Sequence, residues 1–247
     1  MIIQPASFAV VIPARYASSR FPGKPLVEIA GKPMIQHVWE RSALAVGSEK
    51  VYVATDDSRI HDAARDFGAN VVMTSSTCIT GTDRLAEANK ELGLDFLVNV
   101  QGDEPLVEPR DITAIVESFS RSGNITNAMA SITTEAEFSS RNVPKVVFNQ
   151  RSELLYMSRA PIPNSKSSNF VFGYKQVCIY AFSRQQLEFF GGHSQKSPFE
   201  ALEDIEILRF LEAGYTVDMI EVEEATIAVD VPEDVDRVLE KLGANHV

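Results

Sequence analysis

The chain has 247 residues, a formal net charge of −11 and 45% hydrophobic residues, which is the composition of an ordinary soluble globular protein. The acidic balance argues against a general nucleic-acid binder, because such proteins neutralise phosphates with lysine and arginine. No apolar run reaches membrane-spanning length, and the first residues are too few and too uncharged for a signal peptide. Two distant cysteines, Cys78 and Cys178, fit a reducing compartment, and the four histidines show no zinc pattern. We therefore expect a soluble, cytoplasmic protein.

The first predicted element is a buried strand over residues 8–12 (FAVVI), which Pro13 ends. The segment after it carries three cations, Arg15, Arg20 and Lys24, among serine, proline and glycine residues, and is too irregular for a helix. A loop that leaves the carboxyl end of a central strand is where open α/β sheets bind ligands. Arginine forks and a lysine ammonium there favour a polyphosphate. Solvated surface charge explains the composition equally simply.

Strand and helix patterns alternate from there to about residue 120. Strands are predicted over 51–54, 70–74 and 96–100, and helices over 33–46, 58–67, 81–92 and 110–120. Ser58 is the expected N-cap of its helix. Such alternation with short connections implies βαβ units, so the sequence predicts a doubly wound, mostly parallel α/β sheet flanked by helices.

The pattern becomes less regular after residue 120. Strands are predicted over 127–133, 145–148, 177–182, 216–222 and 227–230, and helices over 184–190, 198–211 and 232–242. Neither an internal repeat nor a clear linker divides the chain. We therefore expect a single domain over 1–247, within which about 125–185 forms a smaller subregion for substrate and dimer contacts.

Two aspartates follow predicted strands and precede predicted turns or helices. Asp103 lies in VNVQGDEP, where Gly102 permits close backbone approach, and Asp230 ends the predicted strand in IAVDVPED. A carboxylate at a strand end suits Mg²⁺, which takes one or two carboxylates together with substrate phosphate oxygens. A lone aspartate there is more simply a helix N-cap. The second aspartate favours the metal, since the two carboxylates could meet across one crevice.

These motifs resemble a known family. The segment from Ile12 to Leu26 resembles the I-P-A-R-Y-x-S-x-R-x-P-G-K-P-L signature of sugar-nucleotide cytidylyltransferases, specifically the 3-deoxy-manno-octulosonate (KDO) cytidylyltransferases. In that family the loop wraps the triphosphate of CTP, and V-Q-G-D-E-P and V-D-x-P-E-D segments supply two magnesium-binding aspartates. The resemblance extends over about residues 8 to 240. It implies a nucleotide-diphospho-sugar transferase-like fold, Mg²⁺ as cofactor and a homodimer.

The resemblance also implies roles for individual residues. Catalysis would depend on Arg15, Lys24, Asp103 and Asp230, of which the two aspartates would hold the metal. Nucleotide contacts would come from Pro13, Ala14, Arg15, Ser19, Arg20, Lys24, Gly81, Thr82, Arg84 and Asp103. Sugar contacts would come from Gln101, Arg159, Lys175, Gln176, Tyr180, Glu200 and Glu203, with Lys175 available to the sugar carboxylate. Glu200 and Glu203, one turn apart, equally suit a solvated helix face.

Two positions depart from the family pattern in the part that corresponds to its sugar pocket. Gln176 stands where the family usually has histidine, and Ile207 stands where it usually has glutamine. Sites that hydrogen-bond a substrate discriminate strongly, because an unpaired buried polar group is unfavourable. The two departures therefore leave the identity of the sugar open.

The implied reaction joins CTP to a 3-deoxy-ulosonic acid, most simply KDO, to give the CMP-sugar and pyrophosphate for lipopolysaccharide or surface-polysaccharide synthesis. The same reaction on 8-amino-KDO or another 3-deoxy-ulosonic acid is the alternative. A nucleotidyltransferase for another base or sugar, and a non-catalytic nucleotide or sugar sensor on this scaffold, also stay open. An NAD(P)-dependent reductase is disfavoured, because the glycine fingerprint is missing.

Overall fold

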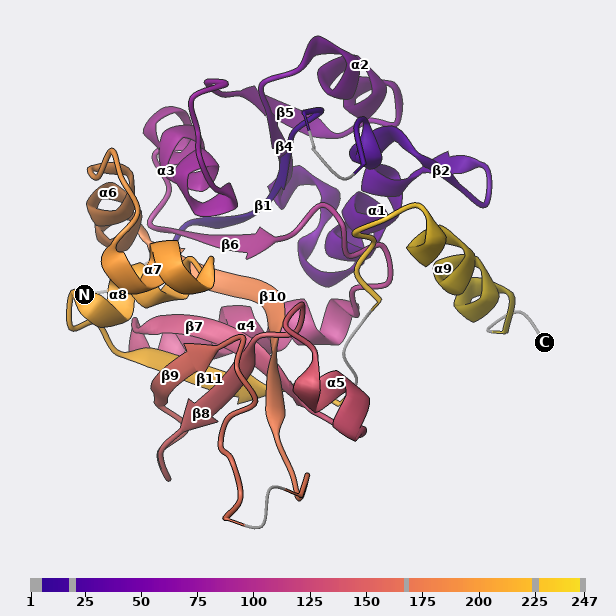
Figure 1. The fold of residues 1–247 in the computed structure, drawn as a ribbon. Helices are drawn as coiled ribbons and strands as arrows, with labels where there is room; N and C mark the ends of the chain where they lie inside the picture. Colours follow the sequence, from indigo (N-terminus) through magenta and orange to yellow (C-terminus); the bar gives the residue numbers. More distant parts are fainter. Residues whose placement is uncertain (1–5, 18–20, 167–168, 224–226, 245–247) are drawn as a thin grey trace.

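A mixed sheet runs through the middle of the molecule, and helices cover both of its faces (Figure 1). The structure, a computed structural model, describes residues 6–17, 21–166, 169–223 and 227–244, and within them the sheet has nine strands. Seven strands lie in the order β11 (Val217–Glu221), β7 (Ile125–Ser131), β10 (Tyr174–Ser183), β6 (Phe96–Val100), β1 (Phe8–Ala14), β4 (Val51–Thr55) and β5 (Asn70–Met73). The other two, β8 (Lys145–Phe148) and β9 (Leu154–Ser158), extend the sheet beyond β10. A separate ribbon pairs β2 (Glu28–Ile29) with β3 (Lys32–Pro33).

Most of the helices pack into two apolar cores, one on each face of the sheet, and a third, smaller apolar cluster contains Val238 of α9 (Glu233–Ala244). One core contains side chains of α1 (Met34–Val46), α2 (Ser58–Asp66) and α4 (Pro109–Ser122). The other contains side chains of α3 (Gly81–Leu92), α6 (Arg184–Gly191) and α8 (Ile207–Glu212). The remaining helices are α5 (Glu135–Ser139) and α7 (Pro198–Glu203). The predicted class, a doubly wound α/β sheet flanked by helices, is confirmed.

Strand β1 shows why its sequence is a continuous apolar run. Ala9 and Val11 point into the core beneath α3, whereas Val10 and Ile12 point into the core beneath α1. Because successive side chains alternate between faces, a strand covered by helices on both sides must be apolar at every position. β1 is therefore fixed in the centre of the sheet, and so is the point where its carboxyl end emerges.

The order of the strands reverses at β1. The chain runs from β1 to the parallel strands β4 and β5 on one side, and then returns to β6, parallel to β1 on its other side. In open α/β sheets this reversal leaves a crevice at the carboxyl ends of the two strands, where ligands bind. The loops after β1 and β6 meet there.

Strand β10 runs antiparallel to β6 and β7 and joins the main sheet to the β8–β9 extension. Its register shifts between Val177 and Tyr180, and the Asn127 side chain donates hydrogen bonds of 2.9 Å to the carbonyls of Val177 and Ile179 there. In the extension, the fully buried Lys145 donates to the carbonyls of Ser140, Val143 and Arg159, each at 2.7 Å. These bonds satisfy backbone groups that the sheet leaves without partners.

The structure corrects three details of the sequence prediction. The single helix expected over 198–211 is two helices, α7 and α8, because Asp204 adopts a left-handed conformation (φ 53°) that ends α7. Residues 227–230 form no strand, since the backbone N–H of Val229 donates to the carbonyl of Asp103 (2.9 Å) instead of a ladder. The N-cap of α2 is Asp57, whose carboxylate accepts from the Arg59 N–H, and not Ser58.

In the parts of the chain that the structure describes, no helix is both long enough and apolar enough to cross a bilayer.

A buried ion pair ties α7 to α8. Arg209 donates to both carboxylate oxygens of Glu200 (2.6 and 2.8 Å) and to the carbonyl of Phe190 (3.0 Å), and both charged side chains are buried. Removing the arginine would leave a buried carboxylate without its cation. We expect Arg209→Met to lower the free energy of unfolding by about 3–5 kcal/mol in urea titrations.

Arg121→Met is the matched control, because Arg121 lies on the solvent side of α4 and should change stability by no more than about 0.5 kcal/mol. A loss below about 1 kcal/mol in Arg209→Met would contradict the role given to the pair.

Candidate active site

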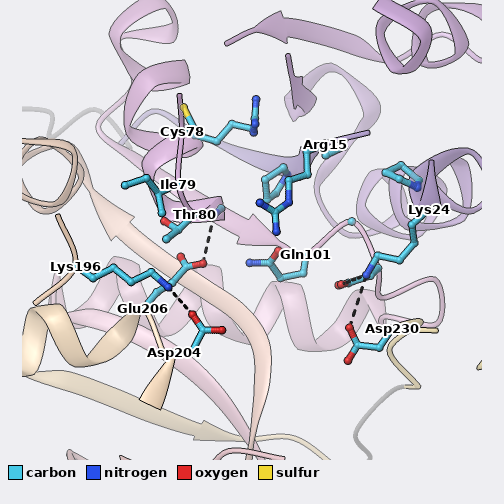
Figure 2. Close-up of a pocket in the computed structure, with 17 residues that line it drawn as sticks. Arg15, Lys24, Cys78, Ile79, Thr80, Gln101, Lys196, Asp204, Glu206 and Asp230 are labelled. Atoms are coloured by element: carbon cyan, nitrogen blue, oxygen red, sulfur yellow. Dashed lines mark hydrogen bonds and ion pairs between the residues drawn. The ribbon is translucent and has the colours of Figure 1, made fainter. Parts of the chain in front are cut away.

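A cavity of about 330 Å³ opens at the carboxyl ends of β1 and β6 (Figure 2). Its wall is built by the loops after these two strands, by the start of α3 and the segment before it, and by residues around α7 and α8. Asp230, before α9, completes it. The fold thus brings segments from most of the chain to the switch point of the sheet.

The loop after β1 directs a lysine into this cavity. Gly23 adopts a left-handed conformation (φ 72°), and its N–H donates to the carbonyl of Tyr16 (3.0 Å). A Cβ at Gly23 would lie 3.1 Å from the Tyr16 ring, so the tight turn has room for glycine alone. Lys24 begins a short 3₁₀ helix directly after it, and its ammonium lies in the cavity next to Asp230 (Figure 2).

Two carboxylates converge on the Lys24 ammonium. Its Nζ lies 2.7 Å from Oδ2 of Asp103 and 3.9 Å from Oδ1 of Asp230 (Figure 2). Asp103 follows β6, and the bond from the Val229 N–H to its carbonyl holds the two acidic segments together. The Asp234 side chain accepts from the N–H of Asp230 (2.9 Å), which fixes the turn that carries the second carboxylate.

The donor set at this point fits a hard divalent cation. Two half-exposed aspartates already face one positive charge, and Mg²⁺ characteristically takes one or two carboxylates plus phosphate oxygens. The described residues contain no group of three or more His, Cys, Asp or Glu side chains that could hold a metal by themselves. A metal at Asp103 and Asp230 would therefore need further ligands from a substrate.

The start of α3 forms the side of the cavity next to the sheet. Thr80 caps the helix, and Glu206 accepts from the N–H groups of Gly81 (3.3 Å) and Thr82 (2.9 Å) and from the Thr82 hydroxyl. Burial raises the pKa of the Glu206 carboxyl above its ordinary value, and these hydrogen bonds oppose that shift in part. Glu206 thus joins α8 to the helix end that faces the cavity.

Among the described residues that line the cavity, the one thiol, that of Cys78, is not activated as a nucleophile. Burial and the neighbouring Glu87 carboxylate raise the pKa of this thiol to about 12. The thiolate is then scarce at neutral pH, and the thiolate is the reactive form. The site suits a reaction in which positioned charges stabilise phosphates and the substrates react with each other.

Most predicted nucleotide and metal residues come together here. The cavity is lined by Pro13, Ala14, Arg15, Lys24, Gly81, Arg84, Gln101, Asp103 and Asp230. Thr82 lies directly behind them, bonded to Glu206. Ser19 and Arg20 lie outside the described residues. Sequence motifs separated by more than 200 residues therefore meet in one site.

The predicted sugar residues other than Gln101 are not brought into the cavity wall. Lys175 pairs with Glu137, and Gln176 donates to the Asn127 side chain. The Arg159 guanidinium donates to the carbonyls of Glu203, Arg141 and Asp204, and the Glu203 carboxylate accepts from Ser158 and the Arg159 N–H.

Two of the sugar assignments are corrected by burial. Tyr180 packs on Phe182 inside the core, where burial holds its pKa well above the ordinary value. Glu200 is fully buried in its ion pair with Arg209. Neither side chain lines the cavity, because each is already committed to the interior.

Sequence reasoning missed three charged residues of the wall: Lys196, Asp204 and Glu206. Glu206 could have been predicted, because it directly precedes Ile207, a position that corresponds to the family's sugar pocket. Asp204 carried no such signal, because the break between α7 and α8 has no proline or glycine to announce it. Lys196 lies in the predicted loop between α6 and α7, where a single lysine gives no sign of a role.

A mixed sheet with a cation-bearing loop after β1 and acidic residues after β6 defines a nucleotidyltransferase, and comparisons with known proteins agree. The model of the cytidylyltransferase family matches residues 9–224. The chain is 45% identical over 248 residues to the 3-deoxy-manno-octulosonate cytidylyltransferase of Geobacter metallireducens, covering 94% of this chain and 96% of that one. It is also 45% identical over 235 residues to the 8-amino-3,8-dideoxy-manno-octulosonate cytidylyltransferase of Shewanella sediminis, covering 92% and 94%.

Solved structures show the same relationship. A CMP:2-keto-3-deoxy-manno-octonic acid synthetase in complex with CTP superimposes with a TM-score of 0.91 at 37% identity, over 97% of this chain and 100% of that one. The 4-diphosphocytidyl-2C-methyl-D-erythritol synthase of Anaerococcus prevotii, at 13% identity and a TM-score of 0.65, shares the fold over 98% of each chain. The chain therefore belongs to the cytidylyltransferase family, in its 3-deoxy-manno-octulosonate group. Cytidylyltransferases of this kind generally use a divalent metal.

Gly102 lies where β1 and the loop after β6 approach each other closely. A Cβ there would lie 2.8 Å from the carbonyl oxygen of Pro13, a backbone atom of the cavity wall. Gly102→Ala must therefore displace one of the two segments. We expect turnover to fall about tenfold or more, with a stability loss of about 1–3 kcal/mol, measured by steady-state kinetics and urea unfolding.

Gly243→Ala is the control, since a Cβ at this position in α9 would meet nothing within 4 Å. Unchanged kinetics in Gly102→Ala would contradict the close packing of the two loops.

Proposed function

We propose that this enzyme transfers CMP from CTP to a 3-deoxy-ulosonic acid, most simply KDO, and releases pyrophosphate. The observation that carries the proposal is the Lys24 ammonium facing Asp103 and Asp230 in a cavity that also contains Arg15. The product would supply lipopolysaccharide or surface-polysaccharide synthesis. Close relatives named for this reaction, and a relative solved with CTP, support the assignment.

In this reaction the anomeric hydroxyl of the sugar acid attacks the α-phosphorus of CTP in line, and pyrophosphate leaves. Arg15 and Lys24 neutralise the triphosphate, which favours departure of the highly charged pyrophosphate. Pro13, Ala14, Gly81 and Arg84 line the same cavity and would orient the nucleotide. Little covalent chemistry is required of the protein, in agreement with the protonated Cys78 thiol.

Asp103 and Asp230 would hold Mg²⁺. When bound, the ion supplies Lewis-acid stabilisation of phosphate charge. The two aspartates contribute by keeping their carboxylates at one point, which the Val229–Asp103 backbone bond and the Asp234–Asp230 bond maintain without substrate.

The sugar is the least constrained part of the proposal. Relatives named for KDO and for its 8-amino form are equally similar to this chain, so identity does not separate them. Both departures from the family pattern point inward: Ile207 is fully buried and Gln176 bonds to Asn127. Neither residue lines the cavity, so the departures do not decide between the sugars. The 8-amino sugar, or another 3-deoxy-ulosonic acid, is the second candidate because relatives named for the 8-amino sugar are as similar as those named for KDO. A non-catalytic sensor is disfavoured because the acidic pair and the phosphate-side cations share one cavity.

We further propose that residues 125–185 form the subregion for dimer contacts within one domain, and that the enzyme is a cytoplasmic homodimer. Leu155, Val171 and Phe172 are large apolar side chains of this subregion that are 58–70% exposed. Exposed large apolar side chains support such contacts, because they would be covered in an interface.

The metal assignment makes a direct prediction. Asp103→Asn and Asp230→Asn keep the size of each side chain but remove a charged oxygen donor. We expect turnover to fall about a thousandfold in each variant, while the urea midpoint changes little, because both carboxylates are part exposed. Pyrophosphate release with CTP, KDO and Mg²⁺ measures the effect.

Asp62→Asn, an exposed carboxylate of α2, is the matched control and should keep wild-type turnover. Turnover close to wild type in either active-site variant would remove that residue from the metal site.

A further inference from the structure

A 3-deoxy-ulosonic acid carries a carboxylate next to the carbon that bears its attacking hydroxyl. If the proposed function holds, on which this inference rests, the enzyme must place that anion close to the triphosphate, which is itself highly negative. A cation separate from the phosphate-binding residues would offset the repulsion. The charged residues of the cavity wall show which side chain can provide it.

The proposed function places Arg15 on the triphosphate, and Arg20 lies outside the described residues. The other cations expected from the sequence are committed elsewhere. Lys175 is paired with Glu137 and is absent from the cavity wall. The Arg159 guanidinium is held by three main-chain carbonyls and is absent from the wall as well. Lys24 faces the two aspartates, and the buried Arg84 donates to Thr74 and lies 3.4 Å from Asp56.

Lys196 is the remaining lysine among the described residues of the wall. It lies between α6 and α7 and extends toward the cavity on the side of Gln101 opposite to Lys24 and Asp230 (Figure 2). Gln101 is the predicted sugar contact that the structure does place in the wall. Lys196 therefore faces the space next to Gln101, across the cavity from Lys24 and Asp230.

The ammonium of Lys196 is held in place by a carboxylate that it shares with a second cation. It donates to the Asp204 carboxylate, which also lies 4.0 Å from the Arg159 guanidinium, so two cations share one carboxylate. The hydrogen bond from Lys196 lowers the pKa of Asp204, and Arg159 adds to the effect, so Asp204 stays ionised. The left-handed conformation of Asp204 between α7 and α8 turns its side chain to this position.

We propose that Lys196 is a substrate-binding residue that forms the ion pair with the carboxylate of the sugar acid, and that Asp204 is its positioning residue. An ammonium has three donors, so Lys196 can keep its bond to Asp204 and still donate to a ligand. Arg159 then acts through Asp204, because it also attracts the Asp204 carboxylate and so leaves part of the Lys196 charge for the sugar acid. The break between α7 and α8 has a functional consequence in this arrangement, because it places Asp204 at the cavity.

The test separates binding of the two substrates. We expect Lys196→Met to raise the KM for the sugar acid about tenfold to a hundredfold and to leave the KM for CTP within about twofold, since the lost interaction is a charge-assisted hydrogen bond to the sugar alone. Lys196→Arg keeps the charge and should recover most of the loss. Lys90→Ala, which removes an exposed lysine at the end of α3, is the control for a general charge effect.

A sugar analogue with a carboxamide in place of the carboxylate provides a second measurement. The wild type should bind this neutral analogue about as weakly as the Lys196→Met variant binds the sugar acid itself, because the ion pair is absent in both cases. Asp204→Asn, which tolerates the left-handed conformation, should raise the KM for the sugar acid less than Lys196→Met does.

The outcomes separate the two proposals. Wild-type turnover together with an unchanged sugar KM in Lys196→Met would overturn the inference and leave the function standing. A rise confined to the KM for CTP would reassign Lys196 to the nucleotide and would also overturn it. No turnover by the wild type with any 3-deoxy-ulosonic acid would overturn the proposed function, and the inference with it.

Discussion

The site depends on one constraint: an ammonium and two carboxylates must be held together where the ends of β1 and β6 meet. Lys24 comes from the loop after β1, Asp103 follows β6, and Asp230 comes from a segment more than 120 residues later. Displacing any of the three groups would weaken the attraction between the ammonium and the carboxylates or leave the two carboxylates to repel each other. Charges at such distances interact by several kcal/mol at an effective dielectric of about 20. The two apolar cores, the tight turn at Gly23 and the Val229–Asp103 bond all fix these three groups.

Around that centre the cavity has two chemically different sides. One side carries Lys24 and the acidic pair, as a triphosphate with a divalent ion requires, and Arg15 lies between the two sides above Gln101 (Figure 2). The other side carries Lys196, Asp204 and Glu206, all from the region of α7 and α8. A division of this kind suits two anionic substrates that must approach each other, since each anion then has a cation of its own.

The nucleotide side could be predicted from the sequence, and the sugar side largely could not. Arg15, Lys24 and Asp103 follow strands whose apolar runs are plain, so their positions at the sheet edge follow from topology. The strand predicted to end at Asp230 does not form, and the place of Asp230 was indicated by the resemblance of its segment to the family motif. Asp204 depends on a helix break at a non-glycine residue, and Lys196 becomes recognisable only through its contact with Asp204. Tyr180 and Glu200 were assigned to the sugar by resemblance, and burial in the core corrects both. β9 and α5 were missed because their short segments show no clear period.

The most direct test of the account is pyrophosphate release from CTP and Mg²⁺ with KDO, 8-amino-KDO and a nine-carbon ulosonic acid offered separately. The account predicts release with at least one eight-carbon 3-deoxy-ulosonic acid and none without a sugar acid. Release with KDO would show that Gln176 and Ile207 are compatible with that sugar, and release with the 8-amino form alone would make these two positions the first candidates for the change in specificity. No release with any of the three, from an enzyme that still binds CTP, would contradict the account.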